Sequence, residues 1–248
     1  MAGGGGGRPV PVANLTHAAA AAAVSTTRFR RRRPVRVRRG NLHTSSLGGG
    51  LILHLGVDLD GVLGDILAVS VRALNDYFGR EVRVEEVRDY DLSKVYGLSR
   101  EEIREFFAAR QDLLEEMPPM PGAGPCLQSL SRRCRVTIVT ARPPFQEDMT
   151  RNWLARHGFA YHDLVLVGSH DKREACRRAG IEVFIDDRLE NALMLASEGL
   201  PVILFAAPHN RSPELPPGVV SLEGWETIYA YLRCCLEGAP LAGLGGGL

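Results

Sequence analysis

Two aspartates stand one residue apart where an apolar run ends. The segment from 55 to 65 reads LGVDLDGVLGD, with Asp58 and Asp60 after the apolar run and Asp65 at its end. Carboxylates at the mouth of a buried strand are costly unless a cation compensates their charge. The spacing therefore raises the question of what that cation is.

Further reactive residues follow other apolar runs. Thr140 ends the run RVTIVT. Asp186 ends the run EVFID, and Asp187 directly follows it. Lys172 opens a helical pattern after LVLVGSHD. In open α/β sheets the carboxyl ends of the strands meet at one edge, where ligands bind. We therefore expect carboxylates, a hydroxyl and an ammonium group to converge there.

This donor set suits metal-assisted phosphate chemistry. Carboxylate oxygens are hard ligands of the kind that Mg²⁺ prefers, together with water and phosphate oxygens. A carboxylate beside Mg²⁺ can attack phosphorus and form an aspartyl-phosphate. Thr140, Lys172 and free backbone N–H groups can hold the other phosphate oxygens as charge develops.

Each residue alone also has a structural explanation. Asp58-Leu59-Asp60 is often a turn, Asp187 can cap the following helix, and a single lysine is usually solvated. However, the chain has 30 basic residues and only two are lysines, Lys94 and Lys172. A lysine that persists in an arginine-rich chain indicates a need for a compact ammonium group. Order, strand context and residue type together favour a site.

Strands and helices are predicted to alternate from residue 51 onward, which is typical of a parallel sheet covered on both faces. The predicted strands are 51–57, 135–140, 164–168, 182–186 and 201–205, and the predicted helices after the second strand are 145–157, 171–179, 188–198 and 222–236. We therefore predict an α/β fold with a Rossmann-like parallel sheet.

A helical insert is predicted after the first strand. The segments 68–78, 85–96 and 99–112 are polar and lack a strand pattern, and SREE makes Ser99 an N-cap with Glu102 three residues later. We expect this insert, about residues 68–118, to be a small helical cap above the sheet.

The first 50 residues are compositionally biased. The first 57 residues contain no acidic residue, and RFRRRRPVRVRR spans 28–39. Residues 1–50 are predicted to be a disordered basic extension, with an organelle transit peptide or a basic arm as alternatives. The folded domain is expected over 51–240 and a flexible tail over 241–248. Five cysteines without metal-ligand spacing favour a reducing compartment.

The motifs resemble those of the haloacid dehalogenase-like phosphohydrolases. DLDGVLGD at 58–65 is similar to their first motif, VTAR at 139–142 to the second, Lys172 to the third and IDD at 185–187 to the fourth. The dehalogenases of this superfamily lack the second aspartate of the first motif. Asp60 therefore indicates phosphoryl transfer.

The resemblance implies a role for each motif residue. Asp58 would be the nucleophile, and Asp60 the general acid and base. Thr140 and Lys172 would hold the phosphate. Asp58, the Asp60 backbone carbonyl and Asp186 would bind Mg²⁺. Asp187 would support the metal site.

The closer resemblance is to the 5'(3')-deoxyribonucleotidases and their bacterial nucleotidase-like members, over residues 52–236. DLDGVLGD, PMPGA at 119–123, and ILFAAPHNRSPELPPG at 203–218 followed by Trp225 carry it, with YDLSKVYGLS at 90–99 like the bacterial members. The human-type second motif has a threonine and a serine. Here Thr140, Ala141 and Arg142 stand there, and Arg142 is expected to replace the missing phosphate contact.

A Mg²⁺-dependent nucleotidase acting through an aspartyl-phosphate is therefore predicted. The alternatives are a phosphatase of a sugar phosphate or other small metabolite, and a non-catalytic binding protein of the same fold. We expect a small phosphorylated substrate and no membrane or nucleic-acid partner. A homodimer is one possible assembly, and the expected location is cytoplasmic. Aromatic residues of the cap that could hold a base are Tyr90, Tyr96, Phe106 and Phe107.

Overall fold

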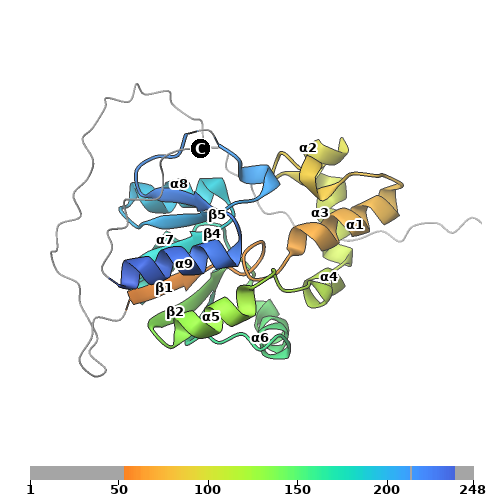
Figure 1. Cartoon of the computed structure of the whole chain (residues 1–248). Coiled ribbons are helices and arrows are strands. Elements are labelled where there is room, and N and C mark those ends of the chain that lie inside the picture. Colours follow the sequence, from red (N-terminus) through yellow and green to blue (C-terminus); the bar gives the residue numbers. More distant parts are fainter. Residues whose placement is uncertain (1–52, 213, 238–248) are drawn as a thin grey trace, which may run out of the picture. The chain divides into compact units, whose positions relative to one another are not determined.

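The computed structural model describes residues 53–212 and 214–237, and all of them belong to one compact unit (Figure 1). These residues form a sheet of six parallel strands in the order β3-β2-β1-β4-β5-β6. The strands are β1 Leu53–Val57, β2 Cys134–Thr140, β3 Asp163–Leu166, β4 Val183–Asp186, β5 Val202–Phe205 and β6 Val219–Leu222. The predicted α/β parallel sheet is confirmed. The predicted extension 1–50 and tail 241–248 lie outside the described residues.

The sheet reverses direction of growth at β1. From β1 the chain adds β2 and β3 on one side, then crosses to add β4, β5 and β6 on the other. Such a reversal leaves a crevice at the carboxyl ends of the two strands that flank it. The first two aspartates of the sequence follow β1, so this order of strands places them at the crevice.

Alternating side chains of the strands enter two separate cores. In β4, Val183 and Ile185 pack with Trp225 of one core, while Phe184 packs in the other. Helices α5 Ala123–Ser131, α6 Glu147–Arg156 and α9 Gly224–Leu236 contribute to the first core, and α7 Arg173–Ala179 and α8 Leu189–Ser197 to the second. Figure 1 shows α5 and α9 on one side of the sheet and α7 and α8 on the other. This burial on both faces explains the continuous apolar strands.

Two elements were not predicted from the sequence. The strand β6 contains only four residues, two of which are half-buried, and the predicted helix 222–236 in fact begins at residue 224. Helix α5 contains a glycine and a proline in its first turn, which hide its helical pattern. The structures of β6 and α5 are therefore determined by tertiary packing more than by local amino-acid composition.

The insert after β1 is helical. It comprises α1 Ile66–Phe78, α2 Leu92–Tyr96, α3 Arg100–Ala109 and α4 Asp112–Glu116, with a 3-10 turn at Val84–Glu86 between α1 and α2. Outside the insert, 3-10 turns follow β2 at Pro144–Gln146 and β5 at Pro208–Asn210. Figure 1 shows α1 to α4 gathered beside the carboxyl edge of the sheet. We call α1 to α4 the cap. Its limits at 68 and 118 remain a prediction.

The cap helices begin where the sequence indicates. The Ser99 hydroxyl accepts a hydrogen bond from the Glu102 backbone, and the Glu102 carboxylate accepts one from the Ser99 backbone, as expected for a capping box. Asp65 caps α1 by accepting from the Ala68 N–H at 3.0 Å. The two segments that connect the cap to the sheet lie side by side, since the Asp65 N–H donates to the Pro118 carbonyl at 2.8 Å.

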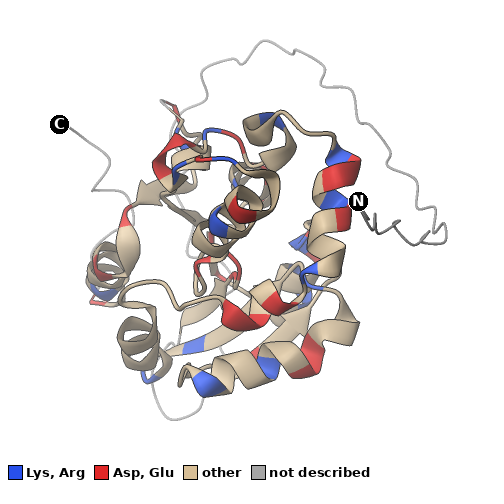
Figure 2. Ribbon diagram, turned by 90° about the vertical axis from the view of Figure 1, so that its right-hand side faces the viewer, with Lys and Arg blue, Asp and Glu red and all other residues tan. Residues whose placement is uncertain are grey.

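Charge on the described surface is mixed. Figure 2 shows basic and acidic residues interspersed along the helices, and most of the basic ones have acidic partners within 4.0 Å. A surface that follows a nucleic-acid backbone typically has basic residues clustered on one face or along one helix. Of the described helices, none has the length and apolar character that a membrane span requires.

Candidate active site

Three strand ends bring the predicted residues together. Asp58 directly follows β1, Thr140 is the last residue of β2, and Asp186 is the last residue of β4. Because β1 lies between β2 and β4, the three side chains come from adjacent strands. The Asp58 N–H donates to the Ile185 carbonyl at 2.9 Å, which fixes the first aspartate beside the β4 end.

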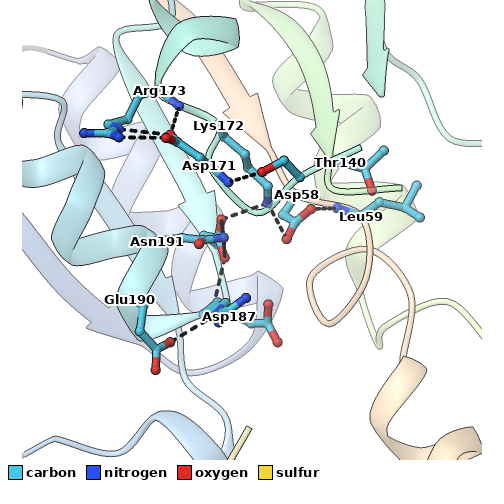
Figure 3. A network of polar contacts seen from close by, with 12 residues as sticks. Asp58, Leu59, Thr140, Asp171, Lys172, Arg173, Asp187, Glu190 and Asn191 are labelled. Atoms are coloured by element: carbon cyan, nitrogen blue, oxygen red, sulfur yellow. Dashed lines mark hydrogen bonds and ion pairs between the residues drawn. The ribbon is translucent and has the colours of Figure 1, made fainter. Parts of the chain in front are cut away.

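Lys172 lies between two carboxylates (Figure 3). Its Nζ is 2.6 Å from Asp58 Oδ2 and 2.9 Å from Asp186 Oδ2, and its side chain is only 1% exposed. Burial by itself lowers the pKa of Lys172, but the two carboxylates outweigh burial and raise the pKa above its ordinary value. Lys172 is therefore a fixed ammonium group at the centre of the site.

Asp186 is completely buried and held by further donors. Its Oδ1 accepts from the Arg188 backbone N–H at 2.9 Å, and its Oδ2 accepts from Asn191 Nδ2 at 3.1 Å. Asn191 is a residue that sequence reasoning missed, since an asparagine inside a helix gives no motif signal. The structure also corrects the expectation that Asp187 caps α8, because the Arg188 N–H bonds to Asp186 instead.

Three buried carboxylates cluster around one position. One oxygen from each of Asp58, Asp186 and Asp187 lies within 4.8 Å of the other two. Burial raises the pKa of Asp58, although Lys172 opposes this, and burial likewise raises the pKa of Asp187. Lys172 supplies a single positive charge within hydrogen-bond distance of two of them. The set is thus one that a divalent cation would complete.

Asp60 contributes no side chain to this cluster. The expected ligand from Asp60 is its backbone carbonyl, and that role stays a prediction. Asp187, which was expected only to support the site, offers an oxygen to the cluster on equal terms with Asp58 and Asp186. The donor chemistry fits Mg²⁺, which accepts one or more carboxylates and fills its remaining positions with water and phosphate oxygens.

The turn after β5 positions Asp187. Asn210 Nδ2 donates to the Asp187 carbonyl at 2.6 Å and to the Phe205 carbonyl at 2.8 Å, and His209 Nε2 lies 3.2 Å from Asp187 Oδ2. His209 and Asn210 belong to the 3-10 turn Pro208–Asn210. What the sequence did not reveal is that the turn binds a carboxylate of the site.

Gly61 permits the approach of Asp187 to the loop after β1. The Gly61 φ angle is +85°, and a Cβ atom there would lie 2.2 Å from Asp187 Oδ2. Both the backbone angle and the contact exclude a side chain.

We therefore expect Gly61→Ala to lower the free energy of unfolding by about 1 to 3 kcal/mol, because strain and displacement of Asp187 add. Urea unfolding followed by circular dichroism measures this change. Gly124→Ala is the matched control, since Gly124 lies in α5 with nothing within 4 Å of its Cβ position. Equal stability of the two variants would contradict the prediction.

Arg142 contacts Asp60 with its guanidinium group. Arg142 Nε is 2.9 Å from Asp60 Oδ2, and Arg142 Nη2 is 2.6 Å from Asp60 Oδ1. Arg142 Nη1 donates to the Thr150 hydroxyl at 3.2 Å. The phosphate contact expected of Arg142 therefore remains a prediction. In the structure Arg142, from the second motif, contacts Asp60 of the first motif.

Thr140 and Ala141 complete the loop after β2. Thr140 is completely buried and its Oγ1 accepts from the Arg142 backbone N–H at 3.2 Å, while Ala141 is half-buried. Thr140 lies close to Asp58 in Figure 3. The roles expected of Thr140, Ala141 and Lys172 toward a phosphate group stay predictions.

A pocket of about 880 Å³ connects the site to the cap. Asp187, Arg188 and His209 line it from the sheet side, and Tyr90 and Phe107 from the cap. The Tyr90 ring centroid lies 5.5 Å from that of His209, and the Arg188 guanidinium carbon lies 4.6 Å from the Tyr90 centroid.

The other two aromatic candidates belong to the cap interior. Tyr96 is 4% exposed and its hydroxyl donates to the Val71 carbonyl, while Phe106 is 5% exposed. Trp225 lies in the core, with its indole N–H donating to the Val62 carbonyl at 2.7 Å. Of the four aromatic residues named from the sequence, Tyr90 and Phe107 therefore reach the pocket.

Comparison with known proteins identifies relatives of the whole described region. A family model described as 5' nucleotidase, deoxy (pyrimidine), cytosolic type C protein matches residues 52–232. A protein of Halalkalibacterium halodurans named "Putative nucleotidase" is 32% identical over 181 residues, covering 72% of this chain and 92% of its own. A "Putative 5'(3')-deoxyribonucleotidase" of Chlorobaculum tepidum is 27% identical over 191 residues, covering 72% of this chain and 89% of its own.

Solved structures show the same fold. A hydrolase of the haloacid dehalogenase-like family from Streptococcus pneumoniae superposes with a TM-score of 0.53 at 18% identity, covering 73% of this chain and 98% of that one. The structural match and the family match agree with the four motifs at the strand ends. The chain therefore belongs to the 5' nucleotidase, deoxy (pyrimidine), cytosolic type C family, and it is a nucleotidase or phosphatase with the fold of the haloacid dehalogenase-like hydrolases.

Proposed function

We propose that the protein is a Mg²⁺-dependent phosphomonoesterase that forms an aspartyl-phosphate on Asp58. One observation carries the proposal: a buried lysine bridges Asp58 and Asp186 at the strand ends, with a third carboxylate, Asp187, beside them. A purely structural ion pair needs one carboxylate, and burying three is costly unless a further cation joins. A site that assembles around a metal and a phosphate explains the arrangement.

Asp58 is the proposed nucleophile because its position is fixed. Its Oδ1 accepts from the Leu59 N–H at 2.7 Å and its Oδ2 bonds to Lys172. In the first step an Asp58 oxygen forms a bond to phosphorus while the ester P–O bond breaks. The Asp60 carboxyl gives its proton to the departing ester oxygen, so that an alcohol leaves.

The second step regenerates the enzyme. Asp60, now a carboxylate, takes a proton from a water molecule, and the water oxygen bonds to phosphorus. The bond between phosphorus and the Asp58 oxygen breaks, which releases inorganic phosphate and restores the Asp58 carboxylate. Lys172 and Thr140 hold the non-reacting phosphate oxygens during both steps, and Lys172 offsets the charge that develops there.

Asp58, Asp186 and Asp187, with the Asp60 carbonyl, are the residues that would hold Mg²⁺. When bound, the ion supplies positive charge that brings the phosphate and the Asp58 carboxylate together in spite of their like charges. The proposal is supported by the clustering of the three carboxylate oxygens and by the single lysine charge between two of them.

The proposed substrate is a nucleoside monophosphate, with a deoxyribonucleotide as the specific case. The pocket volume of about 880 Å³ lies within the range of small-molecule sites, and Tyr90 and Phe107 offer aromatic surface on the cap side. The family description and the name of the Chlorobaculum tepidum relative support the same class.

A substrate panel tests the proposal. Phosphate release is measured with Mg²⁺ from dUMP, dTMP, the other nucleoside monophosphates, and a set of sugar phosphates. We expect the highest kcat/KM for a nucleoside monophosphate and no release in EDTA. Release from sugar phosphates alone would retain the mechanism and overturn the nucleotide assignment. Full activity in EDTA would overturn the metal dependence.

Metal binding is expected to stabilise the fold. A cation that binds only the folded state at 100 times its dissociation constant adds about 2.7 kcal/mol to the free energy of unfolding. We expect Mg²⁺ to raise the melting temperature of the wild type, and to raise that of Asp187→Asn much less. Scanning calorimetry with and without EDTA measures both. An identical Mg²⁺ response of the two proteins would contradict a metal site at Asp187.

The homodimer and the cytoplasmic location also belong to this proposal. Light scattering of the purified chain tests the first, and a fluorescent fusion that retains residues 1–50 tests the second.

A further inference from the structure

Asp60 and Arg142 form an unusually complete ion pair for an active-site loop. Both donors of one guanidinium edge are used, with Nε at 2.9 Å from Asp60 Oδ2 and Nη2 at 2.6 Å from Asp60 Oδ1. The Arg142 side chain is 3% exposed, whereas the Asp60 side chain is 27% exposed. The arginine is therefore enclosed by protein, and the aspartate is the member that solvent and substrate can reach.

Arg142 is itself held from several directions. Its Nη1 donates to the Thr150 hydroxyl on α6, its backbone N–H donates to Thr140 Oγ1, and its carbonyl accepts from the Gly168 N–H at 3.0 Å. Thr150 is completely buried. A guanidinium group braced in this way loses little freedom when it binds a carboxylate, and its planar fork fixes the orientation of that carboxylate.

We infer that Arg142 is a positioning residue for Asp60, and this inference rests on the proposed phosphatase function. Three of the five guanidinium N–H groups donate to Asp60 and Thr150, and two of these three go to Asp60; a direct phosphate contact through the other N–H groups is the alternative. The structure thus assigns a fixed orientation to the proposed acid and base through a residue that touches neither phosphorus nor the ester oxygen.

The bidentate contact is compatible with both proton transfers. In the first step the protonated Asp60 oxygen points its O–H at the ester oxygen and still accepts from Arg142 through a lone pair, while the other oxygen keeps its own bond to Arg142. In the second step the Asp60 carboxylate accepts a proton from water with the fork still in place. Losing Arg142 leaves the Asp60 carboxyl group free to rotate, which slows proton transfer without removing the acid.

The leaving group separates positioning from phosphate binding. Nucleoside monophosphates expel a poor leaving group that needs a proton, whereas 4-nitrophenyl phosphate expels a stable phenolate. We expect Arg142→Ala to lower kcat/KM for dUMP by about 100-fold, as for other losses of acid catalysis. For 4-nitrophenyl phosphate the expected loss is below about tenfold, because kcat/KM there reports a step with little need of the acid.

A double-mutant cycle gives the second readout. If Arg142 acts only through Asp60, Asp60→Asn with Arg142→Ala is no slower on dUMP than Asp60→Asn alone. Thr150→Val keeps the shape of α6 and removes the brace, so it should show the same leaving-group pattern with a smaller loss. This variant also serves if Arg142→Ala does not fold. Arg151→Ala is the matched control, an exposed arginine paired with Glu147 on the same helix.

Each outcome bears on a distinct claim. Equal losses on both esters with weaker inhibition by inorganic phosphate would make Arg142 a phosphate ligand and overturn the inference alone. Additive losses in the cycle would also overturn it. A wild type that hydrolyses neither ester with Mg²⁺ would overturn the proposed function and the inference together. Unequal losses with a non-additive cycle support the inference.

Discussion

Asp58→Asn is expected to lower phosphate release at least about 10,000-fold, the scale of loss seen when an enzymatic nucleophile is removed. The amide cannot attack phosphorus, although it has nearly the shape of the carboxylate. Its oxygen can still accept from the Leu59 N–H, so the fold should persist. The measurement is phosphate release from dUMP with Mg²⁺, with circular dichroism to confirm folding.

The control for this variant is another loop aspartate. Asp171 precedes Lys172 and pairs with Arg173 at the surface, so Asp171→Asn removes a carboxylate near the site without touching the strand ends. We expect it to retain activity. Retention of more than a tenth of wild-type activity by folded Asp58→Asn would exclude Asp58 as the nucleophile.

Lys172→Met is expected to affect both activity and stability. Removing the ammonium group leaves Asp58 and Asp186 buried without a cation, and breaking a buried ion pair in this way costs about 3 to 5 kcal/mol. Activity on dUMP should fall at least about 100-fold, because a group that offsets transition-state charge is lost. Urea unfolding in EDTA measures the stability change.

The sequence of the chain supplies the control for Lys172→Met. Lys94, the only other lysine, is exposed and pairs with Asp89, so Lys94→Met should leave the free energy of unfolding nearly unchanged. Mg²⁺ should restore part of the stability of Lys172→Met, since the ion would then compensate the charge of the carboxylate cluster. A variant as stable as the wild type in EDTA would contradict the charge-compensation account.

The sequence indicated the site because strand ends carry it. Asp58, Thr140 and Asp186 each follow a continuous apolar run, and parallel strands must bring such positions to one edge. Lys172 was informative because lysine is rare in this chain. The structure places its ammonium group between two of the predicted carboxylates.

The partners of these residues could not be predicted in the same way. Asn191 and Thr150 lie on helices whose distance from the strand ends depends on tertiary packing. A polar residue in such a position has no periodic or motif signal, and only the folded chain shows which backbone or carboxylate it meets. For Arg142 the motif position was noted, but its orientation toward Asp60 required the structure.

The helices and strands likewise divide into those that the sequence predicted and those that depend on tertiary packing. The buried strands β1, β2, β4 and β5 were found from their apolar runs, whereas β6 and α5 were not. The edge strand β6 is stabilised by pairing with β5, and α5 by packing against β2 and α9, so neither needs a strong local preference.

The central claim is that phosphate passes through a covalent bond to Asp58. The most direct test uses Asp60→Asn, in which hydrolysis of the intermediate should be slowed. The variant is mixed with Mg²⁺ and 4-nitrophenyl phosphate, whose phenolate leaves without a proton, and quenched with acid. The phosphoryl group is then located by peptide mass spectrometry. We predict phosphorylation of the peptide that contains Asp58, lost on hydroxylamine treatment and lacking in Asp58→Asn. Wild-type hydrolysis of dUMP with a phosphoryl group on another residue would contradict the account.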